Sequence, residues 1–265
     1  MLTIFDDLLI TTIMESLYKF AYDKAFLGAL ILLIAINVIA VFLEDSFFMK
    51  SVMPLFIPVF LIFFFMKRNT LGIVFISFLL FSFLGDITTM FLYEEHIIEI
   101  SSILYAASYI CLLVMVVPKL KLIKPNLVIT AYLLIVLSIT LYFLFVIYGL
   151  LQAVVPNSNE VLLFGVKSLV LIILGFVSFT VYLSTQSKQS ALFLTSIIFF
   201  GLSSILNYVN LYYLYDWSFE LLHKLLYAIA LFVMFSYVMD LGLTRTPKQF
   251  RLNQNNRYSS DAVLS

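Results

Sequence analysis

Long apolar segments alternate with short polar links along most of the chain, and this pattern predicts a membrane protein made of helices. Each segment approaches the length of about 20 apolar residues that a helix needs to cross a bilayer. Uninterrupted Leu, Ile and Phe runs argue against the alternating strands of a membrane β-barrel. We therefore predict an all-α bundle of eight transmembrane helices. They cover residues 25–42, 51–66, 71–92, 97–117, 127–151, 161–183, 191–214 and 219–243.

The two ends of the chain depart from this pattern. Within residues 1–24, Leu9, Ile13 and Leu17 recur at helical spacing among charged residues, which predicts an amphipathic helix on the membrane surface. Residues 244–265 are polar, and we expect them to form a disordered cytoplasmic tail. The eight-helix domain then spans residues 25–243, with links so short that consecutive helices are antiparallel neighbours.

Composition supports a membrane location and excludes several functions. Hydrophobic residues make up 63% of the chain and charged residues 11%, whereas a soluble domain carries about 25% charged residues. A soluble enzyme is therefore excluded. The net charge of zero excludes a nucleic-acid partner. Because Cys111 is the single cysteine, we expect no disulfide within the chain, and we predict no metal or other cofactor.

The basic residues predict the orientation of the bundle. Twelve lysines and arginines fall in the terminal segments and in the links of one side, against Lys50 alone on the other side. Because basic loops stay in the cytoplasm, both termini are expected there. Frequent Phe, Ile, Lys and Asn residues are typical of a low-GC bacterium, so we expect the protein in a bacterial inner membrane.

Polar residues inside the predicted helices gather in their outer halves. Ionisable groups are costly in hydrocarbon, so Asp86 and Lys167 need a partner or a function. On three helices the polar residues follow the i, i+4, i+7 spacing of a single face. These faces hold Ser82, Asp86 and Thr89; Ser203, Asn207 and Asn210; and Glu220, Lys224 and Tyr227. We predict a polar pocket that opens outward, in which a lysine neutralises Asp86.

Further candidate pocket residues lie at the same depth. They are Lys50, Glu99, Ser204 and His223. A simpler interpretation remains open for several candidates. Lys50, His223 and Lys224 are close enough to the interface to extend into water, and the serines and asparagines of the seventh helix are suited to hydrogen bonds between helices.

Two motifs resemble those of a known family. The run Phe81-Ser82-Phe83-Leu84-Gly85-Asp86 resembles the FSLLGD-type signature of the YhhN family, the lysoplasmalogenases, which are membrane proteins of similar length and topology. Lys50 with Met53-Pro54 resembles the Lys-Pro…Met-Pro region of that family, although serine follows the lysine here. Gly201-Leu202-Ser203-Ser204 resembles a second motif, which ends in Ser-Asp in the family.

The resemblance implies hydrolysis of the vinyl ether bond of a lysoplasmalogen, with a lysophospholipid as substrate. This reaction needs an acid that protonates the enol-ether carbon and a water that attacks the resulting cation, and two carboxyl groups suit these roles. Asp86 matches the first family aspartate and is the implied catalytic residue. The second falls at Ser204, and the family histidine falls at Tyr109. Glu99 is a candidate replacement carboxylate.

Two other functions fit the same residues. Serine at position 204 also suits a protein that binds membrane lipids or other amphiphiles without chemistry. A small ion-coupled transporter would use Asp86 and Lys167 as a pair. The chain has only 8 glycines, and its predicted helices lack interruptions, both of which argue against transport. The inner halves of these helices also provide no polar path across the membrane. The oligomeric state stays open.

Overall fold

The computed structural model describes residues 27–40, 46–66, 71–90, 95–120, 127–214 and 216–261. Within these ranges the regular structure is helical throughout, which confirms the predicted all-α fold. The amphipathic helix predicted for residues 1–24 lies outside the described residues, and so does the side chain of Lys50.

Each predicted apolar segment coincides with one helix. A helix over Leu27–Ala40 comes first. It is followed by α2 (Ser46–Met66), α3 (Ile73–Met90), α4 (Glu95–Val116), the short 3-10 helix η1 (Val117–Lys119), α5 (Leu127–Val154), α6 (Ser158–Thr185), α7 (Lys188–Tyr212) and α8 (Trp217–Asp261).

The helices fall into two groups by apolar length. Among the described residues, α4 to α8 contain 5 stretches long and apolar enough to cross a membrane, which indicates an integral membrane protein. The fully described apolar parts of the three other helices, Leu27–Ala40, Ser51–Phe65 and Ile73–Thr89, comprise 10–17 residues each. Of the eight predicted spans, five therefore coincide with helices that are long and apolar enough to cross a membrane.

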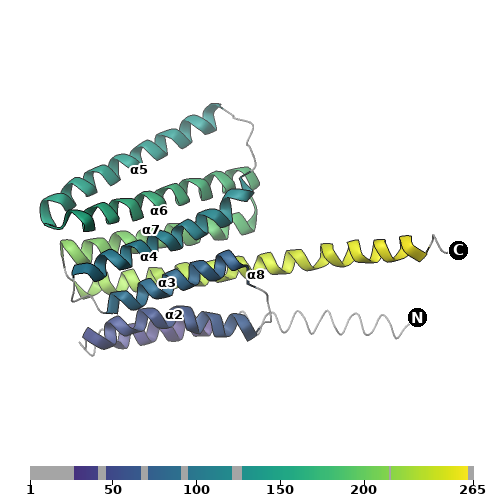
Figure 1. The fold of residues 1–265 in the computed structure, drawn as a ribbon, viewed down its shortest axis with the longest axis horizontal. Coiled ribbons are helices and arrows are strands. Elements are labelled where there is room, and N and C mark those ends of the chain that lie inside the picture. The colour runs from purple at the N-terminus through teal and green to yellow at the C-terminus, as the bar shows by residue number, and fades with distance from the viewer. Residues whose placement is uncertain are drawn as a thin grey trace.

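The helices lie side by side in one bundle (Figure 1). The most extensive contacts join α7 to α8 and α3 to α4, and α4 also packs on α6. Helix α2 packs on α3 and α8. Helix α5 packs on α6 near their short link and diverges from it toward its other end (Figure 1). This divergence leaves one side of α6 and α7 uncovered.

Aromatic side chains fill the centre of the bundle. Phe60 of α2 and Phe235 of α8 have ring centroids 5.6 Å apart, and Phe78 of α3 and Phe200 of α7 are 6.0 Å apart. All four side chains are fully or almost fully buried. Because lipid is as apolar as these side chains, the bundle is held by close packing rather than by water exclusion. Packed aromatic rings supply large contact areas of this kind.

The link between α6 and α7 is short and is held by hydrogen bonds at the helix ends. Gln186, with φ of 45°, and Ser187 form the tight link between α6 and α7, and Ser187 exchanges hydrogen bonds with Ser190 in a capping box.

Helix α8 does not end near Leu243 but continues to Asp261. The backbone of 244–261 is therefore helical, which differs from the disordered tail expected from its polar composition. Long polar side chains such as Arg, Lys and Gln are compatible with a helix.

Candidate functional site

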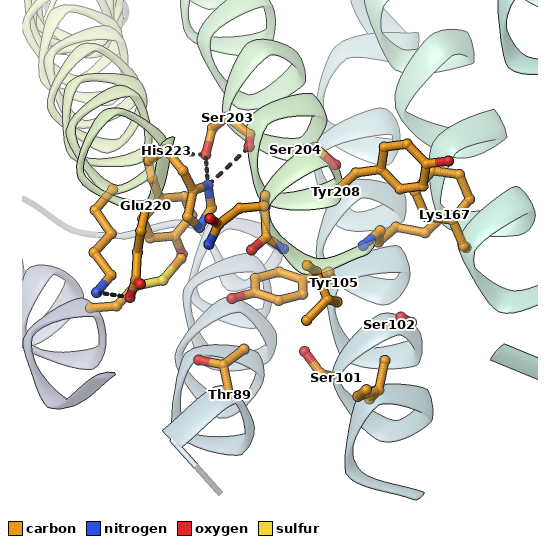
Figure 2. Close-up of a pocket in the computed structure, with 18 of the residues that line it drawn as sticks. Thr89, Ser101, Ser102, Tyr105, Lys167, Ser203, Ser204, Tyr208, Glu220 and His223 are labelled. Atoms are coloured by element: carbon orange, nitrogen blue, oxygen red, sulfur yellow. Dashed lines mark hydrogen bonds and ion pairs between the residues drawn. The ribbon is translucent and has the colours of Figure 1, made fainter. Parts of the chain in front are cut away.

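A polar cavity of about 320 Å³ opens at the end of the bundle where α3 and α7 end and α4 and α8 begin. Figure 2 shows side chains from these helices and from α6 around it. The predicted pocket residues that line it are Thr89, Tyr109, Lys167, Ser203, Ser204, Asn207, Asn210, Glu220, His223, Lys224 and Tyr227. Ser82 and Glu99 do not line it. Most of the residues that the helical spacing predicted to lie together therefore line one cavity at this end of the bundle.

Asp86 lies behind the wall of this polar cavity. Its side chain is fully buried. The Tyr105 hydroxyl of α4 donates a hydrogen bond to Asp86 Oδ1 at 2.6 Å, and the Tyr227 hydroxyl of α8 donates to Oδ2 at 3.0 Å. Both tyrosines line the cavity. Ser82 is buried one turn before Asp86 on α3. The carboxyl group is thus one side chain away from the cavity.

Gly85 allows this arrangement. A Cβ atom at Gly85 would lie 3.2 Å from Cζ of Tyr105 and 3.3 Å from two other atoms of that ring. The Tyr105 ring therefore crosses the surface of α3 where the glycine leaves room for it, and its hydroxyl reaches the next residue. This close approach explains in physical terms why glycine precedes the aspartate.

The structure pairs neither Lys167 nor Lys224 with Asp86, contrary to the predicted neutralisation by a lysine, and the side chain of Lys50 lies outside the described residues. Lys224 pairs with Glu220 at 2.7 Å, one helical turn away on α8. Lys167 Nζ lies over the ring of Phe164, 5.7 Å from its centroid. Among the described residues, the hydrogen-bond partners of the Asp86 side chain are the hydroxyls of Tyr105 and Tyr227. These hydroxyls occupy both oxygens and separate the carboxyl group from the lysines in the cavity.

The buried His223 ring has a defined tautomer. Its Nδ1 atom lies 2.9 Å from the Ser203 carbonyl oxygen, which can only accept a hydrogen bond, so Nδ1 carries a proton. The Ser203 hydroxyl lies 2.8 Å from the same nitrogen and donates to the His223 carbonyl oxygen at 3.1 Å. The other ring nitrogen, Nε2, then keeps a lone pair. Within the described part of the chain no hydrogen bond reaches Nε2, and His223 lines the cavity.

Several other polar groups of the cavity also lack a protein partner. Ser101 and Ser102 are each 7% exposed. Over the described ranges, their hydroxyls, the Asn207 amide and the Ser204 hydroxyl make no hydrogen bond to protein, and Lys167 makes no ion pair. Buried polar groups in proteins are normally hydrogen-bonded. These groups therefore indicate a polar ligand or water in the cavity.

Glu99 is not placed to replace the missing carboxylate. Its Oε1 atom accepts a hydrogen bond from Asn157 Nδ2 at 3.0 Å. The same asparagine caps α6 by accepting from the Asn159 backbone N–H at 3.1 Å. Glu99 therefore ties α4 to the start of α6, away from the cavity lining. The expectation of Glu99 as a second site carboxylate is not supported by this geometry.

Sequence reasoning missed three contributions to the site. Tyr105 and Ser101 share one face of α4 with the predicted Tyr109, because they are spaced four residues apart. This spacing was available as a signal, whereas the hydrogen bond to Asp86 was not. Glu160, at the start of α6, has a buried side chain that accepts a hydrogen bond from the Tyr212 hydroxyl and so links α6 to α7.

An apolar groove of about 540 Å³ adjoins the polar cavity. It is lined by α5, α6 and α7, at the side that the divergence of α5 leaves uncovered. Phe164, Ser204 and Tyr208 line both spaces. The rings of Phe164 and Tyr208 stack with centroids 4.7 Å apart at this junction. The polar cavity and the apolar groove therefore form adjoining parts of one site.

Comparison of the chain with protein-family models, curated proteins and solved structures found no match. The resemblance to the YhhN family therefore rests on the motifs quoted above. Within the described residues, no three His, Cys, Asp or Glu side chains come together as a metal site.

Proposed function

We propose that this protein binds a single-chain amphiphile, with the headgroup in the polar cavity and the alkyl chain in the apolar groove. One observation carries the proposal: Phe164, Ser204 and Tyr208 line both spaces. A small polar solute would use the cavity alone, and an apolar molecule would leave its unpartnered polar groups unsatisfied. A molecule with both parts fits both spaces.

The ligand enters from the bilayer rather than from water. The groove includes exposed apolar side chains, such as Tyr132, Phe143 and Ile205, which face lipid when the bundle is embedded. The chain gains little free energy by moving from lipid into the groove, because both are apolar. The groove therefore selects for shape, and the headgroup supplies most of the binding free energy.

The number of membrane-spanning helices, the membrane and the orientation are also part of our proposal. The protein is a YhhN-like bundle of eight transmembrane helices in a bacterial inner membrane, with both termini in the cytoplasm and the polar cavity facing outward. The distribution of lysine and arginine supports this orientation. The cavity at the end of α3 and α7 agrees with the predicted outer half.

Hydrolysis of the vinyl ether bond of a lysoplasmalogen is the second candidate function. The observation that favours it is the buried Asp86 carboxyl group, which contacts the cavity only through the hydroxyls of Tyr105 and Tyr227. In this reaction Asp86 would supply a proton, relayed through one of these tyrosine hydroxyls, to the enol-ether carbon, and water would attack the resulting oxocarbenium ion. The hemiacetal then collapses to a fatty aldehyde and an alcohol. Nε2 of His223 is suited to accept a proton from the water.

Hydrolysis ranks second because the second family carboxylate is absent. Ser204 lines the cavity at that motif position, and a serine hydroxyl cannot supply an ionised acid at neutral pH. The carboxylate of Glu220, which also lines the cavity, is held in an ion pair by Lys224. Amphiphile binding, in contrast, needs neither a carboxylate at position 204 nor a Glu220 released from its ion pair.

A groove-filling variant tests the proposed function. A Cβ atom at Gly201, which lines the apolar groove, meets no atom within 4 Å, so Gly201→Leu fills the groove without a backbone clash. Gly149 of α5 is exposed, equally open and outside the groove, so Gly149→Leu is the matched control. The assay measures displacement of a fluorescent monoacyl probe from protein in phosphatidylcholine nanodiscs.

We expect Gly201→Leu to weaken binding of the probe at least tenfold and Gly149→Leu to leave it unchanged. Empty nanodiscs give the background from partitioning into lipid. No saturable binding to the unmodified protein, or equal binding by both variants, would reject the proposed function.

A further inference from the structure

The charges of the described side chains that line the polar cavity do not sum to zero. Lys167, Glu220 and Lys224 line it. Glu220 and Lys224 form an ion pair at 2.7 Å. Lys167 has no carboxylate partner among the described residues. Among the described residues, the cavity wall therefore carries one positive charge, on Lys167, that no carboxylate in contact with it compensates.

Neutral hydrogen-bonding groups line the same cavity as this charge. Lys167 extends from α6 into the cavity, and Ser101 and Ser102 of α4 lie on the facing wall (Figure 2). Asn207 and Ser204 of α7 also line the space. The hydroxyl and amide groups of these four residues are without protein partners in the described structure. Together they offer several donors beside one cation, which is the arrangement that recognises an oxyanion.

An uncompensated ammonium group at this depth is costly. A charged side chain within the bilayer is normally paired or lies in a water-filled space. A ligand oxyanion would supply the missing charge and would accept hydrogen bonds from the serine and asparagine side chains. The cation of Lys167 therefore has its most favourable partner in a negatively charged headgroup.

We propose that the polar cavity selects a single-chain amphiphile whose headgroup is net anionic, a phosphate or carboxylate oxyanion bound by Lys167. This inference rests on the proposed function and names the class of its ligand. A zwitterionic headgroup is disfavoured, because its ammonium group needs a carboxylate. Glu220 is paired with Lys224, and Asp86 is covered by two tyrosine hydroxyls.

The experiment compares headgroups on one alkyl chain. Protein in phosphatidylcholine nanodiscs is titrated with four competitors of equal chain length: an alkyl phosphate, a fatty acid, an alkylphosphocholine and a neutral monoacylglycerol. Displacement of the fluorescent monoacyl probe is measured for each competitor, with subtraction of its partitioning into empty nanodiscs. Comparison of the alkyl phosphate with the fatty acid shows whether the cavity prefers a phosphate or a carboxylate headgroup.

Two variants assign the preference to Lys167. Lys167→Met removes the charge and keeps the length of the side chain, and Lys167→Arg retains the charge. Lys188→Met is the matched control, because Lys188 is 79% exposed, pairs with Asp240 at 3.4 Å and does not line the cavity. A charge-assisted hydrogen bond is strong enough that its loss lowers affinity about tenfold or more.

We expect at least one anionic competitor to bind about tenfold more tightly than the zwitterionic and neutral competitors. This preference should disappear in Lys167→Met and persist in Lys167→Arg and Lys188→Met. Equal affinity for all headgroups in the unmodified protein, or a preference that survives Lys167→Met, would overturn the inference while leaving amphiphile binding intact. Absence of binding by every competitor would instead reject the proposed function.

Discussion

Tyr105 and Asp86 belong to different helices, yet the tyrosine hydroxyl lies 2.6 Å from the Asp86 Oδ1 atom. The ring reaches this position because Gly85 presents no side chain to it. A second hydroxyl, from Tyr227 of α8, donates a hydrogen bond to the other carboxyl oxygen, Oδ2. Three helices are thereby joined at one buried polar group, and the Gly-Asp pair of the sequence acquires a structural role independent of catalysis.

Substitution of Gly85 by alanine should separate this pair. The new Cβ atom would lie 3.2 Å from the Tyr105 ring, which must move away from α3. We expect a loss of about 1–3 kcal/mol from overpacking and from the weakened hydrogen bond. Thermal unfolding in detergent measures the effect. Gly149→Ala is the control, because its Cβ atom meets nothing within 4 Å and alanine favours a helix. Equal unfolding temperatures for the two variants would contradict the prediction.

Replacement of Tyr227 by phenylalanine should leave one Asp86 oxygen without a donor inside the bundle. A buried polar atom that loses its partner costs about 1–3 kcal/mol. In an Asp86→Leu background the hydroxyl has no carboxyl group to bind, so the same tyrosine replacement should cost less. A double-mutant cycle of unfolding free energies gives the coupling between the two residues. Additive effects would show that the hydrogen bond contributes nothing to stability.

The hydrolytic candidate predicts a specific response to carboxyl groups. Asp86→Asn should abolish aldehyde release from a lysoplasmalogen if the unmodified protein has this activity. Ser204→Asp restores the residue that the family motif places there, and we expect it to increase aldehyde release. Gly149→Ala serves as a folded control outside the cavity. No release from folded unmodified protein or from Ser204→Asp would leave binding as the function.

The charge balance of the cavity predicts opposite effects for the two members of its ion pair. Glu220→Gln removes the negative charge beside Lys224, so affinity for an anionic amphiphile should rise severalfold relative to a neutral one of equal chain length. Lys224→Met leaves Glu220 to offset Lys167, and the same ratio should fall. Competition binding in nanodiscs measures both ratios. A change in the same direction for both variants would rule out electrostatics as the cause.

The sequence predicted the helices and the end of the bundle that holds the site, because both follow from periodicity. Apolar runs define where helices lie, and the spacing of Ser203, Asn207 and Asn210 defines a face. The partner of Asp86 was not accessible in this way. Charge complementarity suggested a lysine, whereas helix packing placed Tyr105 and Tyr227 there. Tyrosines are common at membrane interfaces, so their number in the chain concealed the two that matter.

The position of Glu99 shows the same limit. Its sequence neighbourhood, at the start of the helix after Asp86, suggested a second site carboxylate. The fold instead directs it to Asn157, beyond the end of α5. Periodicity along one helix does not specify how that helix is rotated against its neighbours.

The divergence of α5 from α6 has a consequence for how ligand supply is measured (Figure 1). The apolar groove lies between these helices and α7, and several of its apolar side chains are exposed. The amphiphile of the proposed function would therefore reach it by lateral diffusion in the membrane. Occupancy then follows the mole fraction of the amphiphile in the membrane rather than its concentration in water. Dilution of the vesicles in buffer at a fixed ratio of ligand to lipid should therefore leave occupancy unchanged for a ligand that stays in the membrane.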